Sequence, residues 1–584
     1  MMSTIRRGLT LAIVLAILSL TIGVMAQDVA REDTVIFDID SSQIANPTNF
    51  NWLVPGTLRN HGAHQAMWEP LFILNYETGQ IDPWLGTSFD ANETLDVWTL
   101  NLREGVKWSD GEDFNADDVM FTINMLLGDE TATLAEAANM QQWIDSIEKI
   151  DDLTVQFNLK EPNPRFQLDY FSVRIWGSVL IMPEHVWAGK DPFTFTFYDE
   201  EQGWPIGTGP YTLTSAETDR MVWDRDDDWW GAAAGFQDLP EPLRLIWIIT
   251  STEENRAQLM SNAQLDSVMN LTLGAFEAIQ ARNPNVVAWF PELPYAWADP
   301  CARQMSFNTQ VAPWDNVNMR KAVSLIIDRQ QIIDVAYEGT TTPSRSFFVQ
   351  YGGMEPIISA IEEAGMTLSP TADVAAAQAM IEAEGYTMND NGLYEKDGEV
   401  LTADVVVNNS SIEYTRTVDV IVEQLIAAGI DAVARPVTGA THGDLVNNGE
   451  FQLSYDWDGC GSINEPWNSM NRYTAQFLVP IGERSPGSNN WVRWDTEGNA
   501  AYSEIVGEIG VLPLGDPAIV DMVVEAYQYL YDEVPIVPLV QASKLVPFDT
   551  TYWTGWPTQE NNYNHPATWW NSTHQIIHNL TKAG

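Results

Sequence analysis

The run of residues 98–119, WTLNLREGVKWSDGEDFNADDV, constrains the fold of this chain more than any other segment. Its first residues alternate, so that Trp98, Leu100 and Leu102 share one face, and this period of two is typical of a half-buried strand. A turn with the residues W-S-D-G comes next. Asn115 then stands where a helix N-cap is expected, with two aspartates in the first turn after it. The run therefore predicts a strand, a turn and an acid-capped helix in direct succession.

This strand, turn and capped helix closely resemble the signature of the extracytoplasmic solute-binding proteins of ABC importers. The matching branch is family 5, whose members carry peptides, nickel complexes and oligosaccharides. The resemblance implies an α/β fold of the periplasmic-binding-protein type, in which two lobes close on a ligand about a hinge. It also implies a monomer without a cofactor that delivers its ligand to the membrane subunits of an importer. Five further segments match the family in the expected order, at residues 64–74, 206–213, 305–333, 451–467 and 529–540.

By the same resemblance, the chain divides into three regions after a signal peptide. The first region is assembled from residues 27–73, 190–298 and 548–584. The small second region is residues 74–189. The third region, residues 299–547, closes over the ligand.

Periodicity alone predicts part of the third region. Helices are expected over residues 317–327 and 328–337, the second of them capped by its first residue, an aspartate. Residues 401–407 then form a strand, 413–428 a helix and 430–437 a second strand. A strand, a helix and a strand with short links are a βαβ unit on a parallel sheet. No internal repeat is present, which excludes solenoids and propellers.

Residues 1–26 have the form of a cleavable export signal. Arg6 and Arg7 precede an apolar stretch, and the exported chain is expected to begin at Gln27, after Ala26. An uncleaved membrane anchor is the alternative, although the apolar run is short and no second span follows it. We therefore expect a periplasmic or extracellular protein associated with the cell envelope.

The charge of the chain excludes some partners. There are 29 basic and 81 acidic side chains, and the net charge of −52 becomes −54 once the two arginines of the signal are removed. Such a chain cannot neutralise the phosphates of a nucleic acid, and it is repelled by an anionic membrane surface. The acids are spread along the sequence, so they indicate a solvated surface and do not identify a ligand.

The residues give little support for catalysis. The sequence contains no G-x-S-x-G elbow, no H-E-x-x-H helix, no phosphate-binding loop and no C-x-x-C pair. His61 and His64 have the spacing of half a metal site, but a helix start with two polar histidines is the better interpretation. Residues 387–392 resemble a calcium loop without its first acid, so a turn is favoured there. We expect neither catalytic nor metal-binding residues, and a secreted polysaccharide hydrolase is kept as a remote alternative.

Tryptophan is unusually abundant, with 24 residues. Trp98 and Trp108 belong to the strand and turn described above and are expected to be structural. Other tryptophans lie in irregular, polar segments, a mixture that suits sugars, because their C–H faces stack on rings while their hydroxyl groups bind amides and carboxylates. An aromatic closing segment packed on the first region is the alternative. These tryptophans are Trp457, Trp467, Trp553, Trp556, Trp569 and Trp570.

The N-E-P triplet at residues 464–466 bears on the choice between sugar and peptide. Peptide-binding members of the family resembled carry an acid two positions before this triplet, which pairs with the peptide amino group. Here that position holds Ser462, and a buried ammonium without a partner is costly. The tail at residues 552–570 resembles that of the oligosaccharide-binding members. A peptide ligand stays as the alternative, with Asp456 or Asp458 as the replacement anchor.

The expected ligand is therefore a neutral oligosaccharide, held by residues from all three regions. Aromatic rings would stack on the sugar faces, and amides and carboxylates would bind the hydroxyl groups. The candidates for stacking are Trp457, Trp467, Trp553 and Trp556, those for hydrogen bonding are Asp456, Asn464, Glu465 and Asn561, and weaker candidates from the first and second regions are Trp68 and Arg174.

Cys301 and Cys460 are the only cysteines, and both lie in segments assigned to the cleft. In an oxidising compartment a disulfide between them is reasonable, and two buried thiols are the alternative. A disulfide would brace the loop that carries Trp457 and Trp467 against the hinge strand without preventing closure.

Overall fold

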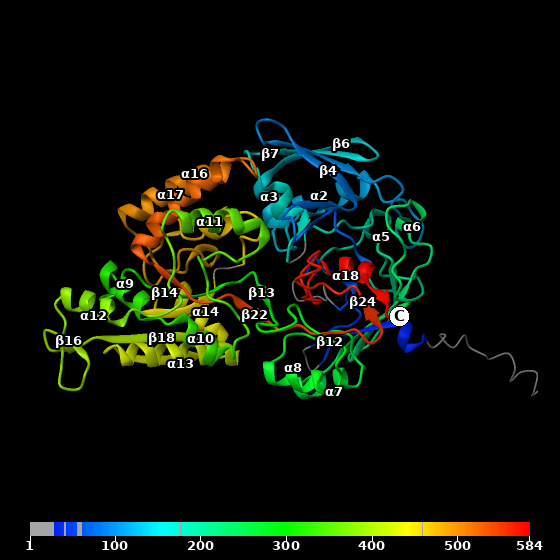
Figure 1. Ribbon diagram of the computed structural model, residues 1–584. Helices are drawn as coiled ribbons and strands as arrows, with labels where there is room; N and C mark the ends of the chain where they lie inside the picture. The colour runs from blue at the N-terminus through cyan, green and yellow to red at the C-terminus, as the bar shows by residue number, and fades with distance from the viewer. Residues whose placement is uncertain (1–28, 40–42, 55–60, 176–177, 458–459) are drawn as a thin grey trace, which may run out of the picture.

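The structure is a computed structural model that describes residues 29–39, 43–54, 61–175, 178–457 and 460–584. The expected export signal lies outside these described residues. Figure 1 shows two lobes, with the expected third region on one side and the first and second regions together on the other. Among the described residues, no helix has the length and hydrophobicity needed to cross a membrane.

The strand, turn and helix predicted from residues 98–119 are confirmed in the second region. The strand is β5 (Val97–Leu102), which buries alternate side chains, and the helix is α2 (Ala116–Leu127). Asn115 and Asp118 form a reciprocal capping box, in which each side chain accepts a hydrogen bond from a backbone N–H near the other. Trp108 is buried, and its Nε1 donates to Asp118 Oδ2 at 3.2 Å. The turn is thus tied to the helix that follows it.

The rest of the second region is built around β5. An antiparallel sheet in the order β4-β5-β7-β6 packs against α2 and α3, and a small sheet in the order β3-β2-β8 joins it to the rest of the lobe. The bounds are β2 Phe72–Leu74, β3 Ile81–Pro83, β4 Gly86–Ala91, α3 Ala137–Trp143, β6 Ile144–Asp151, β7 Thr154–Leu159 and β8 Ser172–Val173.

The first region has its own four-stranded sheet, in the order β1-β11-β10-β9. The C-terminal segment packs on this sheet. The ring of Trp556 stacks on that of Phe548, and Trp553 Nε1 donates to the backbone oxygen of Thr34 in β1. Residues distant in sequence therefore share one core. The bounds are β1 Thr34–Ile39, β9 Tyr211–Ala216, β10 Arg220–Arg225, β11 Arg244–Ile249, α7 Glu253–Ser261, α8 Leu273–Gln280, β12 Val286–Val287, β23 Phe548–Asp549, β24 Trp553–Thr554, α18 Thr573–Asn579 and β25 Thr581–Lys582.

The third region contains a five-stranded sheet in the order β19-β18-β20-β14-β21. The predicted βαβ unit is confirmed, because β18 and β19 pair in parallel and α13 connects them. Val405 and Val407 pack into one hydrophobic cluster and Val406 into another, so both faces of the sheet are covered by helices. The bounds are β14 Arg303–Phe307, α9 Val317–Ile326, α10 Arg329–Ala336, α11 Glu355–Glu363, α12 Val374–Ala383, β18 Thr402–Asn408, α13 Ile412–Ala427, β19 Asp431–Val437, α14 Gly439–Asn447, β20 Leu453–Trp457, α15 Trp467–Asn471, α16 Glu497–Val511, α17 Ala518–Glu533 and β21 Ile536–Pro538.

Several local expectations are also met. Asp328 caps α10 by accepting from the N–H of Gln331 at 2.8 Å. Residues 389–393 form the turn of a hairpin between β15 (Thr387–Met388) and β16 (Tyr394–Lys396), so the turn favoured for residues 387–392 is present. The expected helix start is at Ala63, so His61 lies outside the helix, and His64 is buried and packs edge-on against the ring of Trp68.

The two lobes are joined by a pair of crossover strands. β13 (Trp297–Asp299) leads from the first region into the third, and β22 (Ala542–Lys544) leads back. The two strands pair antiparallel, with Ala298 opposite Ser543. Figure 1 shows both strands at the centre of the molecule, between the lobes. A connection of two short paired strands is the place where one lobe can rotate against the other.

Candidate functional site

A cavity of about 300 Å³ lies between the lobes, next to the crossover strands. Its size is at the lower end of the range for small-molecule sites in proteins. The walls come from segments of the first region (residues 289–298 and 559–562), from the start of the second region (Tyr76) and from the third region (residues 340–352 and Gln541). The cavity is therefore lined by both lobes and by the crossover strand β13.

Aromatic rings form the inner wall of this cavity. Trp297 and Tyr351 stack with ring centroids 5.8 Å apart and planes at 17°, and Tyr76 meets Tyr351 edge-on at 5.6 Å. The hydroxyl of Tyr76 donates to the backbone oxygen of Arg174, and the hydroxyl of Tyr351 donates to that of Ala298 at 2.7 Å. Burial raises the pKa of Tyr76 well above its usual range. With their hydroxyl groups bonded to backbone, these residues offer the cavity ring surface.

Neutral polar side chains complete the lining. Gln541 is buried and is fixed by the 344–350 segment, because its Nε2 donates to Ser344 Oγ at 3.0 Å and its Oε1 accepts from the N–H of Gln350 at 3.1 Å. Gln559 and Asn562 line the cavity from the C-terminal segment. Among the described residues that line the cavity, none carries a charged side chain. The arrangement suits a ligand with flat apolar faces and uncharged hydrogen-bonding groups.

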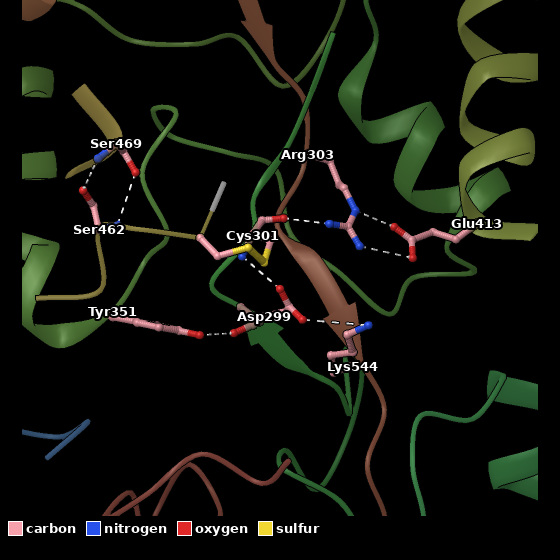
Figure 2. The surroundings of a disulfide bond; sticks show 10 residues. Asp299, Cys301, Arg303, Tyr351, Glu413, Ser462, Ser469 and Lys544 are labelled. Carbon is pink, nitrogen blue, oxygen red and sulfur yellow. Dashed lines mark hydrogen bonds and ion pairs between the residues drawn. A yellow bond between two sulfur atoms is a disulfide. The ribbon is translucent and has the colours of Figure 1, made fainter. Parts of the chain in front are cut away.

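A disulfide joins Cys301 and Cys460 beside the crossover strands. Figure 2 shows it flanked by Asp299, whose carboxylate accepts from the N–H of Cys301 at 2.9 Å, and by Arg303, which donates to the backbone oxygen of Cys301 at 2.8 Å. Arg303 also pairs with Glu413 at 2.7 Å. Cys301, Cys460 and Asp299 are the one group of potential metal ligands in the described part of the chain, and the disulfide occupies both sulfur atoms.

Ser462 stands in the loop after this disulfide and is hydrogen-bonded within the loop. Its Oγ donates to the backbone oxygen of Pro466 at 2.9 Å and accepts from the N–H of Ser469 at 3.0 Å. Its N–H donates to Ser469 Oγ at 3.2 Å. Ser462 is 2% exposed, and Figure 2 shows the two serines facing each other. The position that carries an acid in the peptide-binding branch is thus a neutral residue whose hydroxyl is already satisfied.

Three tryptophans expected in the ligand site lie instead in the core of the first lobe. Trp68, Trp553 and Trp556 are at most 3% exposed. Their indole N–H groups donate to the backbone oxygens of Ile206, Thr34 and Trp553 respectively. In this structure these rings contact other core side chains, and none of the three is among the described residues that line the cavity. The alternative interpretation, an aromatic closing segment packed on the first region, describes Trp553 and Trp556 better.

Four other expected ligand residues make contacts between the lobes. Glu465 pairs with Arg165 at 3.0 Å, and the ring of Trp467 lies under the same arginine. Asn464 Nδ2 donates to the backbone oxygen of Gly79 at 3.1 Å, and Arg174 donates to that of Gly461 at 3.3 Å. These side chains were expected to bind the ligand, but here they bind the opposite lobe.

The last three expected residues are not among the described residues that line the cavity. Asp456 is buried on β20, with Ser454 as a hydrogen-bond partner and His442 at 3.7 Å. Trp457 is 36% exposed and stacks on Tyr414 at 6.0 Å. Asn561 is exposed and donates to the backbone oxygen of Trp556 at 3.3 Å. Asp458 lies outside the described residues.

The residues that do line the cavity left weak signals in the sequence. Trp297 lies four positions before Cys301, in a segment already assigned to the cleft, and Gln559 and Asn562 flank residues of the aromatic tail. Tyr76 and Tyr351 stand in segments that no motif marked. The polar, tryptophan-rich tail therefore contributes to the cavity wall through two of its amides.

A two-lobed α/β protein with paired crossover strands and a cavity between the lobes has the architecture of the periplasmic binding proteins. The sequence model for "Bacterial extracellular solute-binding proteins, family 5 Middle" matches residues 80–477, and the chain belongs to this family.

Solved structures show the same fold over the whole described chain. A periplasmic oligopeptide-binding protein of an oligopeptide ABC transporter from Thermotoga maritima aligns with a TM-score of 0.80 at 21% identity, covering 95% of this chain and 100% of that one. The same Thermotoga protein with mannohexaose bound aligns with a TM-score of 0.71 at 21% identity, over 95% and 99% of the two chains. The oligopeptide-binding protein AppA from Bacillus subtilis, in complex with a nonapeptide, aligns at 0.63 and 16% identity, over 94% and 99%.

Curated relatives are similar over a shorter stretch. The glutathione-binding protein GsiB of Shigella boydii is 27% identical over 306 residues, and that of Escherichia coli strain K12 is 26% identical over the same length. The matched stretch is 52% of this chain and 54% of each relative, so the chain spans about half the length of the curated relatives it matches.

Proposed function

We propose that this protein captures a neutral oligosaccharide in the cavity between its lobes. The observation that carries the proposal is the lining, which combines the stacked rings of Trp297 and Tyr351 with amide and hydroxyl side chains and no charged one among the described residues. Sugar rings present C–H faces to aromatic rings and hydroxyl groups to amides. The mannohexaose-bound Thermotoga structure, which shares the fold, supports the same ligand class.

A peptide ligand is the second candidate, and the AppA and GsiB relatives favour it. A peptide brings a charged ammonium and a charged carboxylate into the cavity, and each needs a partner when it is buried. Ser462 offers no charge to an ammonium, and its hydroxyl is hydrogen-bonded within its own loop, to Pro466 and Ser469. Asp456 is buried beside Ser454 and His442 on β20. The neutral lining therefore favours the sugar.

Capture is proposed to work by closure of the lobes about β13 and β22, with the three regions divided as the sequence indicates. The closed protein would then deliver its ligand to the membrane subunits of an ABC importer, outside the cytoplasmic membrane. The protein is proposed to act as a monomer without a cofactor.

Isothermal titration calorimetry tests the ligand class. The panel holds cello-, manno- and xylo-oligosaccharides of graded length, together with tripeptides to nonapeptides and glutathione. We expect saturable binding of one sugar series and none of the peptides. Tight binding of peptides with no response to any sugar would overturn the proposal.

Two neighbouring asparagines give a matched pair of variants. Asn562 lines the cavity, whereas Asn561 donates to the backbone of Trp556. We expect Asn562→Ala to weaken the best sugar about fivefold, which corresponds to the loss of one hydrogen bond of about 1 kcal/mol. Asn561→Ala is expected to change the affinity less than twofold. Equal losses in both variants would argue against the cavity as the binding site.

Hydrolysis of the bound sugar is the remote alternative. A glycosidase needs two carboxyl groups flanking the scissile bond, and none of the described lining residues supplies one. Incubation with the best-bound oligosaccharide and chromatography of the products decides the question. We expect the sugar to be recovered intact.

A further inference from the structure

One arginine of the second region reaches into the third region. Arg165 precedes α4 (Phe166–Tyr170), and its backbone is held by Asn163, whose Oδ1 accepts the Arg165 N–H at 2.9 Å. Its guanidinium makes its contacts with residues about 300 to 345 positions later in the chain. Arg165 is only 2% exposed, so this contact between the lobes is desolvated.

The third region supplies a socket for this guanidinium, made of Glu465, Trp467, Ile509 and Gly510. Arg165 Nε donates to Glu465 Oε2 at 3.0 Å, Nη1 donates to the oxygen of Gly510 at 2.8 Å and Nη2 to that of Ile509 at 3.4 Å. The centre of the guanidinium lies 4.8 Å from the ring centroid of Trp467. Each guanidinium nitrogen therefore has an acceptor in the other lobe, and one face of the cation has an aromatic ring.

The socket is built to take a cation. Ile509 and Gly510 lie in the last turn of α16, where the backbone carbonyl groups and the negative end of the helix dipole favour positive charge. Glu465 is oriented independently of Arg165, because its carboxylate also accepts from the N–H groups of Trp467 and Asn468 at 3.0 and 3.2 Å. The Trp467 ring is fixed by its Nε1, which donates to the oxygen of Val506 at 3.1 Å.

The location of the socket makes it a contact that exists only when the lobes are together. Figure 1 shows α16 meeting the second region away from the crossover strands β13 and β22. None of the socket residues is among the described residues that line the cavity. Separation of the lobes would expose both Arg165 and Glu465 to water, and their approach would bury both charges as a pair.

We propose that Arg165 and its socket form a latch that sets the fraction of closed protein, and thereby the ligand affinity, without touching the ligand. Removing one partner leaves the other charge buried and unpaired in the closed form only, so the penalty falls on closure. A ligand that binds the closed form then binds less tightly, in proportion to the lost closed fraction. The latch rests on the proposal that the protein captures its ligand by closing, and it is independent of which ligand that is.

Double electron–electron resonance measures the closed fraction directly, without any ligand. Spin labels are attached at Glu148→Cys on β6 and at Ala500→Cys on α16, both exposed positions on opposite lobes, and the native cysteines are held in the disulfide. We expect two distance populations in the otherwise unchanged protein. Arg165→Met should lower the closed-to-open ratio at least about tenfold, and Arg165→Lys should lower it less because the charge is kept.

The matched control is Arg345→Met. Arg345 pairs with Glu355 and Glu362 inside the third region, so its loss removes the same charge without touching the lobe interface. The closed-to-open ratio is expected to stay within twofold in this variant. Glu465→Gln, which keeps an acceptor for the loop N–H groups, tests the latch from the other side if Arg165→Met unfolds at a lower temperature. It is expected to give a similar shift toward the open form.

Two results would overturn the latch. One is a ligand-free protein with no closed population, and the other is a closed fraction in Arg165→Met and Glu465→Gln equal to that of the unchanged protein. Failure of the proposed function has a different signature, because the shift in the closed fraction would remain while no oligosaccharide binds in calorimetry.

Discussion

At the scale of single residues, buried histidines make the folded protein sensitive to acid. Burial lowers the pKa of His565 to about 3 and that of His574 to about 4. Both values lie below the usual value of 6.5, so between these pH values each histidine is protonated in the unfolded chain and neutral in the folded protein. The stability they allow is complete above about pH 6.5 and falls as the pH drops toward 4, by roughly 1.4 kcal/mol per pH unit for each histidine. Chemical denaturation at a series of pH values measures how the free energy of unfolding changes with pH. His574→Phe is expected to remove the contribution of one histidine from this slope.

Glu69 acts in the opposite direction. Burial raises its pKa to about 7, while Trp84 and Trp230 donate their indole N–H groups to its carboxylate at 2.9 and 3.0 Å. A carboxyl group with a raised pKa contributes full stability below about pH 4.5 and loses it as the pH rises to 7. We expect Glu69→Gln to remove this loss. The free energy of unfolding of the variant, relative to that of the unchanged protein, should rise between pH 4 and pH 8 by at most about 3 kcal/mol. A pH-independent difference between the two proteins would contradict the prediction.

At the scale of elements, the disulfide connects the end of β13 to the loop after β20. Cys301 and Cys460 are 159 residues apart in sequence, and a cross-link of that length restricts the unfolded chain by roughly 4–5 kcal/mol in the chain-entropy description. We expect the Cys301→Ser/Cys460→Ser variant to have a lower Tm and a weaker ligand affinity, because the loop that carries Ser462 loses its brace against the crossover strand. Mass spectrometry of the unreduced protein should recover the two cysteines in one linked peptide pair. Free thiols in the exported protein would contradict the brace.

The elements themselves were largely predictable from sequence, because their signals are local. Asn115 and Asp328 cap their helices as the N-cap pattern indicates, and the period of two in β5 places Trp98 on the buried face. The crossover strands were less visible, since β13 and β22 are three residues each and carry no period. Short strands are defined by their partner, and the partner here is some 245 residues away in the chain.

At the scale of the whole molecule, the ligand site was harder to predict, because it exists only when the two lobes meet. Tryptophans in polar segments were expected to face a ligand, but Trp553 and Trp556 fill the core of the first lobe, where their N–H groups find backbone oxygens. Glu465 and Trp467 were expected to bind the ligand and instead receive Arg165. Composition identifies segments rich in suitable side chains, whereas the choice between ligand, core and opposite lobe depends on packing between distant parts of the chain.

The charge of the whole molecule leads to a prediction about salt. With 29 basic and 81 acidic side chains, at least 52 acids have no basic partner even if every base is paired. Added salt should therefore stabilise the fold more by reducing the repulsion among carboxylates than it destabilises the fold by weakening ion pairs. Surface ion pairs such as Lys107–Asp113 are worth at most about 1 kcal/mol each, and salt weakens them. Because the Debye length falls from about 10 Å at 0.1 M to about 3 Å at 1 M, added NaCl should raise the Tm. Differential scanning calorimetry in NaCl checks this, and a rise that levels off at roughly 0.5 M separates screening from the continued, linear effect of solute exclusion. A Tm that stays constant or falls over this range would mean that the acids are dispersed widely enough for their repulsion to be negligible in the folded protein.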